Sequence, residues 1–249
     1  IESFLDYLRL ERNYSERTIV SYQTDLREFE GYLKKTESEL DWKKVHADHV
    51  RNWMVHLMED GKASTSVNRK LSSLRSFYRF LLRKKEVTVN PMLKVVGPKK
   101  KKPLPFFVRE KDMNRLLDEI PFGEGFEGCR DRTILEVFYA TGMRLSELIG
   151  LNDVDVDFST KLIKVTGKRN KQRLIPFGKE LEENLNLYIK VRNEAFPGGA
   201  ECFFVLKNGK RMYPMQVYRL VKRNLSKVVS LKKRSPHVLR HTFATAMLN

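Results

Sequence analysis

The sequence has few cysteines and no long apolar run, and each shortage narrows the classes of protein that it can encode. Its two cysteines, Cys129 and Cys202, lie far apart and form no C-x-x-C pair, which argues against a disulfide-built secreted domain. No apolar stretch approaches the roughly 18 residues that cross a bilayer. Neither a glycine-rich phosphate loop nor a set of metal ligands is evident. We therefore expect a cytoplasmic chain, or a nuclear one if it is eukaryotic, that uses no cofactor or metal and does not enter a membrane.

Positive charge is what the sequence has in excess. Lysine and arginine number 48 against 31 acidic residues, which gives a net charge of +17 over 249 residues. An excess of this size repels itself, so a polyanionic partner is its natural explanation, and a merely soluble basic protein is the alternative. The basic residues are spread over both halves of the chain, which fits an anionic membrane surface less well.

Apolar residues spaced three and four apart predict four helices in residues 1–96. These helices are expected near residues 1–8, 19–33, 50–58 and 67–82. Short loops join them, which suggests a small bundle. His46, His49 and His56 accompany the third helix, but no cysteine or carboxylate completes a metal site there.

The other face of the fourth helix is polar and basic. It carries, at helical spacing, Asn68, Ser72, Arg75, Arg79 and Arg83. Small polar side chains permit a close approach while arginines meet phosphates, so this face suits a helix that lies on double-stranded DNA. A solvated basic face is the alternative.

Residues 97–105 read GPKKKKPLP, a composition that excludes a regular helix or a central strand. The four consecutive lysines, Lys99, Lys100, Lys101 and Lys102, attract phosphate. We interpret this segment as a basic linker that lies along nucleic acid between a first domain, 1–96, and a second domain, 106–249. The chain would then wrap a DNA duplex like a clamp.

The second domain is predicted to be mixed α+β, with a small three-stranded antiparallel sheet among helices. The three β-like runs are Val154–Phe158, Leu162–Thr166 and Arg173–Phe177. The turn between the last two runs carries Lys168, Arg169 and Lys171, and these cations are placed to reach a phosphate or a DNA groove. An exposed basic hairpin is the alternative.

Arg144 opens a predicted short helix, where free backbone N–H groups also favour an anion. Glu147 follows three residues later and is placed to hold the Arg144 guanidinium. An ordinary structural ion pair is the alternative, because such surface pairs are common and weak.

The last fifteen residues predict a helix that starts at Ser235 and Pro236. On this helix His237 and Arg240 are three residues apart and point to the same side, a pair suited to gripping and protonating a phosphate. Its apolar face is expected to consist of Leu239, Phe243, Met247 and Leu248.

Three strings in this order resemble the motifs of the tyrosine recombinases, above all the Xer branch and the related phage and transposon integrases. They are A-T-G-M-R-L-S-E-L at 140–148, T-G-K at 166–168 with N-K at 170–171, and S-P-H-V-L-R-H-T-F-A-T at 235–245. The H-x-L-R-H-T-F-A-T string is highly specific, and the resemblance covers the whole chain. It implies a mainly helical, two-domain protein with an N-terminal four-helix, SAM-like core-binding domain and a mixed α+β catalytic domain.

The resemblance also implies a mechanism in which a tyrosine hydroxyl attacks DNA and forms a 3′-phosphotyrosyl intermediate. Arg144 and Arg240 would hold the non-bridging phosphate oxygens. Lys168 would protonate the departing 5′-oxygen, and His237 would act as acid and base at the phosphate. Glu147 would support Arg144. The covalent bond conserves energy, so religation needs neither ATP nor metal.

The family pattern places a second histidine or tryptophan and the nucleophilic tyrosine beyond Asn249. None of Tyr139, Tyr188, Tyr213 and Tyr218 falls in that position. We therefore expect a chain without its nucleophile, because its C-terminal end is truncated, disordered or naturally absent, and we expect this chain to bind DNA without cleaving it.

The resemblance implies a homo- or hetero-tetramer on two DNA sites. Its biological role would be chromosome dimer resolution or the movement of a mobile element. A type IB topoisomerase-like enzyme and a catalytically incomplete DNA-binding regulator are the alternatives to a recombinase.

The charge and the lysine-rich linker predict that DNA affinity falls steeply as salt concentration rises. The reason is that lysine and arginine side chains displace counterions from the DNA phosphates when they bind. Titrating the protein onto a duplex at several salt concentrations measures this slope. A flat salt response would contradict the clamp.

Overall fold

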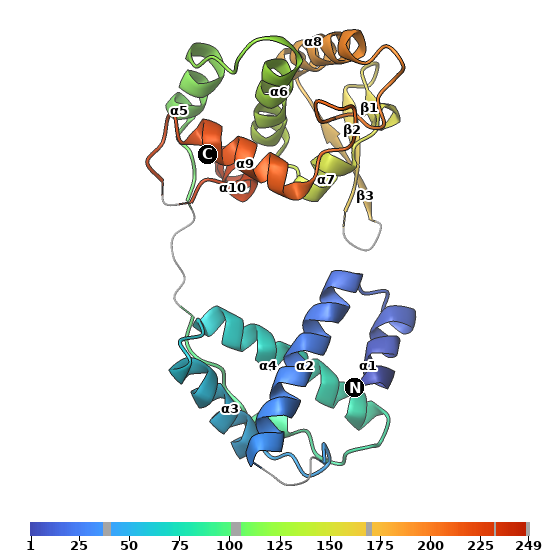
Figure 1. Ribbon diagram of the computed structural model, residues 1–249, viewed down its shortest axis with the longest axis vertical. Coiled ribbons are helices and arrows are strands. Elements are labelled where there is room, and N and C mark those ends of the chain that lie inside the picture. Colours follow the sequence, from blue (N-terminus) through green and yellow to red (C-terminus); the bar gives the residue numbers. More distant parts are fainter. Residues whose placement is uncertain (37–40, 101–105, 168–170, 232, 248–249) are drawn as a thin grey trace. The chain divides into compact units, whose positions relative to one another are not determined.

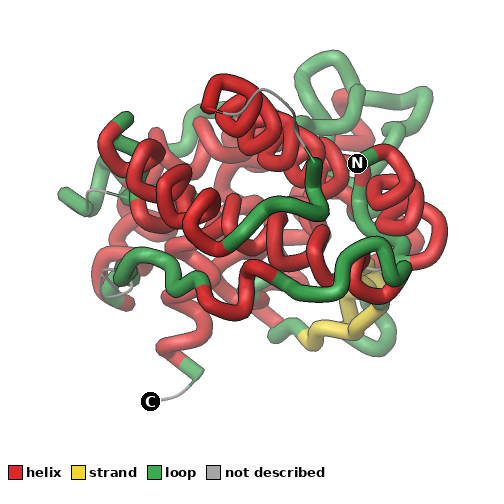
Figure 2. The backbone as a smooth tube through the Cα atoms, turned by 90° about the horizontal axis from the view of Figure 1, so that it is seen from below, coloured by secondary structure: helices red, strands yellow, loops and turns green. Residues whose placement is uncertain are grey.

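The computed structural model describes residues 1–36, 41–100, 106–167, 171–231 and 233–247, which form two compact units, Ile1–Pro103 and Leu104–Asn249 (Figure 1). Helices make up most of both units, and the only described strands lie together in the second (Figure 2). Within those ranges, no helix combines the length and the apolar character that crossing a membrane requires.

The first unit contains the four predicted helices. Its elements are α1 (Glu2–Asp6), which continues as the π-helical turn η1 (Tyr7–Glu11), then α2 (Glu16–Thr36), α3 (Ala47–Glu59), α4 (Ser64–Arg83) and the 3-10 turn η2 (Pro91–Lys94). The apolar faces of these helices meet in one core around Phe29, Trp53 and Leu71. The bundle predicted from apolar spacing is therefore confirmed.

A buried carboxylate also fixes the position of α2 against α4. Asp25 is fully buried on α2 and accepts hydrogen bonds from two side chains of α4, Arg69 (Nη2–Oδ1, 2.8 Å) and Ser73 (Oγ–Oδ2, 2.7 Å). Lys70 adds a longer contact to the same carboxylate, at 3.4 Å. A buried charge is tolerated only with such partners, so these contacts specify one register between the two helices.

The second unit places helices around a small sheet. Its elements are α5 (Glu110–Asn114), the π-turn η3 (Arg115–Glu119), α6 (Gly125–Thr141), α7 (Leu145–Gly150), the 3-10 turn η4 (Asp153–Asp155), β1 (Val156–Asp157), β2 (Leu162–Thr166), β3 (Gln172–Pro176), α8 (Lys179–Ala195), α9 (Pro214–Leu225) and α10 (Pro236–Ala246). The sheet has the order β1-β2-β3, both pairs are antiparallel, and Val165 lies opposite Arg173. The predicted three-stranded antiparallel sheet is confirmed.

The first strand is shorter than predicted. Val154 and Asp155 belong to the 3-10 turn η4, and only Val156–Asp157 pair with β2. The Asp155 carboxylate accepts a hydrogen bond from the backbone N–H of Asn152 at 3.0 Å. This local side-chain bond offers the backbone an alternative to the sheet ladder, which explains the late strand start.

Helix α6 is the centre of the second unit. Ile134, Leu135, Val137 and Phe138 are fully buried, and α8 and α10 both pack against this helix (Figure 1). A helix that is apolar on several faces is stable only when neighbours cover it. Helix α6 ends at the buried Thr141, and Arg144 follows three residues later as the N-cap of α7.

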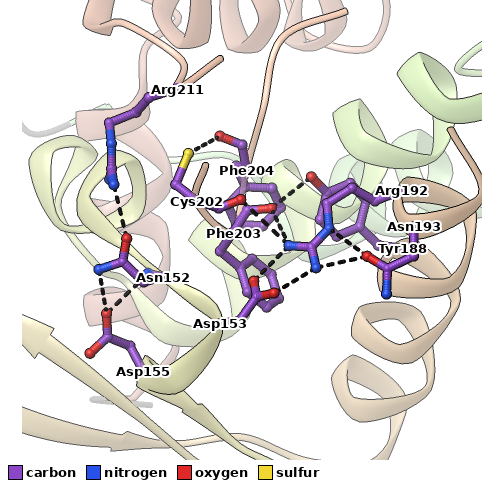
Figure 3. A network of polar contacts seen from close by, with 10 residues as sticks. All are labelled: Asn152, Asp153, Asp155, Tyr188, Arg192, Asn193, Cys202, Phe203, Phe204 and Arg211. Atoms are coloured by element: carbon purple, nitrogen blue, oxygen red, sulfur yellow. Dashed lines mark hydrogen bonds and ion pairs between the residues drawn. The ribbon is translucent and has the colours of Figure 1, made fainter. Parts of the chain in front are cut away.

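Two arginines, the buried Arg192 and the half-buried Arg211, bind the chain at the far end of α7; Figure 3 shows Arg192 with Asp153 and Arg211 with Asn152. Arg211 donates to the carbonyl of Ile149 at 2.7 Å, so it binds a free carbonyl in the last turn of α7. Arg192 is 2% exposed and forms a bidentate pair with Asp153, with Nη1–Oδ1 at 2.6 Å and Nη2–Oδ2 at 2.7 Å. It also donates to the carbonyl of Phe203 at 3.1 Å. Arg211 thus holds the last turn of α7, and Arg192 holds the 3-10 turn η4 that follows it.

The last helix buries a different face from the one predicted. Leu239 is fully buried as expected, but Met247 is 72% exposed, and the prediction that it joins the apolar face was wrong. Val238 and Thr242 are buried instead, and Thr242 accepts a hydrogen bond from the Val108 backbone N–H at 2.9 Å. The last turn extends past the core, which leaves Met247 without cover. Leu248 lies outside the described residues.

Gly142 allows α10 to approach the end of α6. It ends α6 in the left-handed conformation, with φ of 55°, which favours glycine. A Cβ at this position would lie 2.3 Å from the Phe243 ring of α10. Gly150, at the end of α7, has open space where its Cβ would be.

We expect Gly142→Ala to destabilise the second unit by about 2–4 kcal/mol, from backbone strain and overpacking together. Gly150→Ala should stay within about 1 kcal/mol of wild type. Both tryptophans, Trp42 and Trp53, belong to the first unit. Gly142→Ala should therefore move the unfolding transition seen by far-ultraviolet circular dichroism and leave the one seen by tryptophan fluorescence unchanged. Equal shifts in both signals would contradict this assignment.

Candidate active site

Arg144 and Glu147 form the ion pair that their spacing predicts. Arg144 is the N-cap residue of α7, and its Nη1 lies 2.7 Å from Oε1 of Glu147. The backbone N–H of Arg144 also donates to Glu147 Oε2, at 2.7 Å. The glutamate therefore caps the helix and orients the guanidinium at the same time. Arg144 is 44% exposed at its side chain, so an incoming anion can reach it.

Arg173 is a third member of this cluster, and the sequence alone did not single it out. It comes from β3 and binds Glu147 through both terminal guanidinium nitrogens, with Nη1–Oε1 at 2.5 Å and Nη2–Oε2 at 2.9 Å. Its position two residues before the buried Ile175 puts it on the inward face of the strand. An arginine at a core-facing strand position is the signal that could have identified it.

The Glu147 carboxylate is buried and ionised. Its side chain is 0% exposed, and burial alone would raise its pKa. Hydrogen bonds from Arg173, from the Arg144 backbone and from the Arg144 guanidinium outweigh burial and lower the pKa to about 2. The carboxylate therefore stays charged throughout the physiological pH range.

Arg240 of α10 lies beside this cluster. Its Nη1 donates to the carbonyl of Gly142, which places it near the start of α7. Burial and the nearby positive charges of Arg144 and Arg173 lower the pKa of Arg240, and Glu147 opposes them. An arginine does not lose its proton under these conditions. Three guanidiniums facing one carboxylate thus form a cationic site that an anion would stabilise.

His237 is exposed on the first turn of α10 and stacks on His241, with ring centroids 5.2 Å apart. Within the part of the chain that the structure describes, no hydrogen bond joins it to Arg240. His237 and Arg240 both lie on α10, three residues apart, as predicted. The Arg240 side chain, however, donates to the Gly142 carbonyl and not to His237.

The base of the β2–β3 hairpin touches the cluster. The Gly167 N–H donates to the Lys171 carbonyl at 2.8 Å and closes the hairpin. A Cβ on Gly167 would lie 3.3 Å from Glu147 Oε1 and 3.6 Å from Arg144 Nη1. Lys171 is exposed, whereas Lys168 and Arg169, which we expect to bind phosphate, lie outside the described residues.

The predicted DNA-binding residues of the first unit differ in their surroundings. Asn68 donates to the Pro98 carbonyl at 2.8 Å, and Arg75 donates to the Val95 carbonyl at 3.0 Å. These two side chains therefore hold the segment after η2 against α4. Ser72 and Arg79 are exposed on the same helix.

The structure describes two of the four linker lysines. Lys99 and Lys100 are exposed, and Lys101 and Lys102 lie outside the described residues.

Two of the three histidines near α3, His46 and His49, lie at the helix start, and His56 lies in its last turn. His46 is the N-cap residue of α3, and its backbone N–H donates to His49 Nδ1 at 3.0 Å. Among the residues that the structure describes, no group of three or more histidine, cysteine, aspartate or glutamate side chains is arranged to hold a metal ion.

The low pKa of Glu147 predicts a pH-dependent contribution to stability. Because the folded pKa lies near 2 and the ordinary value is 4.5, this contribution is complete above about pH 4.5 and is lost as pH falls toward 2. We compare the free energy of unfolding of wild type with that of Glu147→Gln. The advantage of wild type should be larger at pH 7 than at pH 2 by on the order of 2–3 kcal/mol. Urea unfolding at a series of pH values measures the difference, and a pH-independent difference would contradict it.

Comparison with known proteins identifies the family. The phage integrase family matches residues 107–249, and its N-terminal SAM-like domain matches residues 1–85. The chain is 38% identical over 275 residues to the tyrosine recombinase XerC of Chlorobaculum parvum, covering 100% of this chain and 82% of that protein. It is 37% identical over 248 residues to XerC of Staphylococcus carnosus, covering 100% and 83%.

The fold has a solved counterpart as well. The Tn1549 transposon integrase (residues 82–397), in complex with circular intermediate DNA, is similar with a TM-score of 0.74 and 23% identity, over 99% of this chain and 85% of that chain. This likeness shows a shared fold, while the XerC relatives and the two domain matches show the family. The chain therefore belongs to the phage integrase family and is a tyrosine recombinase, a DNA strand transferase of site-specific recombination.

Proposed function

We propose that Arg144 and Arg240 bind the non-bridging oxygens of the scissile phosphate in double-stranded DNA. One observation carries this proposal: Arg144, Arg173 and Arg240 gather around a single buried carboxylate, which leaves positive charge that a phosphodiester would neutralise. Charge that builds on the phosphate oxygens in the transition state would be stabilised by groups already in place.

In the proposed reaction a tyrosine hydroxyl attacks the phosphorus, and the bond from phosphorus to the 5′-oxygen breaks. Lys168 gives a proton to the departing 5′-oxygen, and His237, the acid and base at the phosphate, takes the proton that the tyrosine hydroxyl loses. Religation reverses these steps, because the phosphotyrosyl bond keeps the energy of the cleaved bond.

We assign the attacking tyrosine to none of the four candidates in this chain's second unit. Tyr188 is fully buried and donates to the Phe203 carbonyl at 2.9 Å, so DNA has no access to its hydroxyl. Burial also raises the pKa of Tyr188 and of Tyr139, which makes each a poorer nucleophile. Tyr213 and Tyr218 are exposed, but neither follows the H-x-x-R string.

On DNA, we propose that residues 1–96 and 106–249 bind one duplex with the 97–105 linker along it, and that four protomers, of one or two kinds, join two sites. The DNA complex of the similar Tn1549 integrase supports the DNA partner of this proposal. Such a protein would act on the nucleoid in the cytoplasm, either in chromosome dimer resolution or in the integration of a mobile element.

The proposal is tested by trapping the covalent intermediate with the full-length protein on a nicked site. We expect a protein–DNA band that survives denaturing electrophoresis and disappears with Arg144→Ala. Arg109→Ala is the matched control, because Arg109 is an exposed arginine of the same unit that pairs with Asp112. Tight binding without a band would favour the DNA-binding regulator, and a band without pairing of sites would favour the topoisomerase-like enzyme.

Lys168→Ala should slow cleavage by about 100-fold or more and change DNA affinity by only about threefold, as expected for a general acid. Single-turnover cleavage and equilibrium binding on the same duplex measure the two effects. Equal losses in both would reassign Lys168 to the positioning of a phosphate.

A further inference from the structure

We infer that Arg173 is a positioning residue, which holds the Glu147 carboxylate in place and thereby sets the direction in which Arg144 faces the phosphate. This inference rests on the proposed phosphate-binding role of Arg144. It concerns a residue that has no direct part in the proposed chemistry.

The first support is the way that Glu147 is saturated. Its Oε1 accepts from Nη1 of Arg144 and Nη1 of Arg173, and its Oε2 accepts from the Arg144 backbone and Nη2 of Arg173. Half of these four bonds therefore come from Arg173. Without them a fully buried carboxylate would keep only the bonds from Arg144, and its orientation would no longer be fixed from two sides.

The second support is the part of Arg144 that remains free. Its backbone and Nη1 bind Glu147, and within the described chain no hydrogen bond is formed by its Nε or Nη2. The rest of the guanidinium is thus available to an anion, and the Glu147 carboxylate determines the direction in which the guanidinium points. A displacement of about 1 Å at such a group can cost on the order of 100-fold in rate.

The third support is the register of the hairpin. Arg173 lies opposite Val165 on β2, and Gly167 at the end of the same pair of strands packs against Glu147 and Arg144. The hairpin base and the start of α7 therefore share one carboxylate. Arg173 is the side chain that joins them, since its bidentate geometry admits one relative placement of strand and helix.

The negative charge of Glu147 explains why an arginine is tolerated at position 173. Arg173 adds a third positive charge beside Arg144 and Arg240, which by itself would be unfavourable. Its bidentate bond keeps Glu147 ionised between the guanidiniums and offsets this repulsion. Lysine would supply the charge without the two parallel bonds.

The test compares Arg173→Gln, Arg173→Lys and Glu147→Gln in the full-length protein, by single-turnover covalent-complex formation and by DNA affinity. We expect Arg173→Gln to slow the reaction by roughly 10- to 100-fold with affinity within about threefold of wild type, and Arg173→Lys to recover part of the rate. The double variant Arg173→Gln/Glu147→Gln should be no slower than Glu147→Gln alone, within about twofold, because Arg173 acts through Glu147.

A pH profile separates positioning from a merely structural role. With two of its bonds removed, Glu147 should bind a proton at higher pH, so the rate of Arg173→Gln should fall on the acid side at a higher pH than that of wild type. Lys164→Gln is the control: Lys164 is a cation of β2 on the same hairpin, and it pairs with Asp155 at 3.7 Å. It should leave the rate and its pH profile unchanged.

The outcomes are distinguishable from those for the proposed function. If wild type forms no covalent complex, the proposed function fails. If wild type reacts and Arg173→Gln reacts equally fast, or if its defect multiplies with that of Glu147→Gln, the positioning role alone is overturned. A loss of affinity in step with rate would show that Arg173 binds DNA directly.

Discussion

The site depends on one buried carboxylate. Glu147 is the anion on which Arg144 and Arg173 converge, and its field also reaches Arg240. If Glu147 were neutral, the guanidiniums would repel one another with little to hold them together. With Glu147 charged, they form a preorganised cationic site at the meeting of a helix start, a strand and the last helix. The same carboxylate caps α7, so the fold and the proposed chemistry share one interaction.

The rest of the second unit keeps this carboxylate buried and oriented. Helix α6 passes through the core and ends at Thr141, so that Gly142 and then Arg144 follow at fixed positions. Arg211 holds the opposite end of α7 at the Ile149 carbonyl. Phe243 packs where only a glycine at 142 leaves room, which brings α10 and Arg240 close. A rigid hydrophobic scaffold thus carries a strongly charged site, as electrostatic catalysis requires.

Helix periodicity and strand alternation were enough to predict the helical bundle and the three-stranded sheet, because apolar spacing directly records which face is buried. The Arg144–Glu147 pair followed from a three-residue helical spacing. Arg173 was not predicted, since its contact with Glu147 spans 26 residues and depends on how the sheet folds onto α7. The exposure of Met247 was missed for a similar reason, because a helical pattern does not show where the core ends. Asn68 and Arg75 also lie on the predicted face, but their bonds to residues 95–98 depend on tertiary structure.

The most direct measurement compares covalent-complex formation on two duplexes, one with the natural scissile phosphate and one with a neutral methylphosphonate in its place. If the arginine cluster acts by neutralising phosphate charge, Arg240→Ala should cost on the order of 100-fold or more on the phosphate and at least about 10-fold less on the neutral duplex. A penalty of the same size on both duplexes would contradict electrostatic stabilisation and would leave Arg240 as a structural link to Gly142.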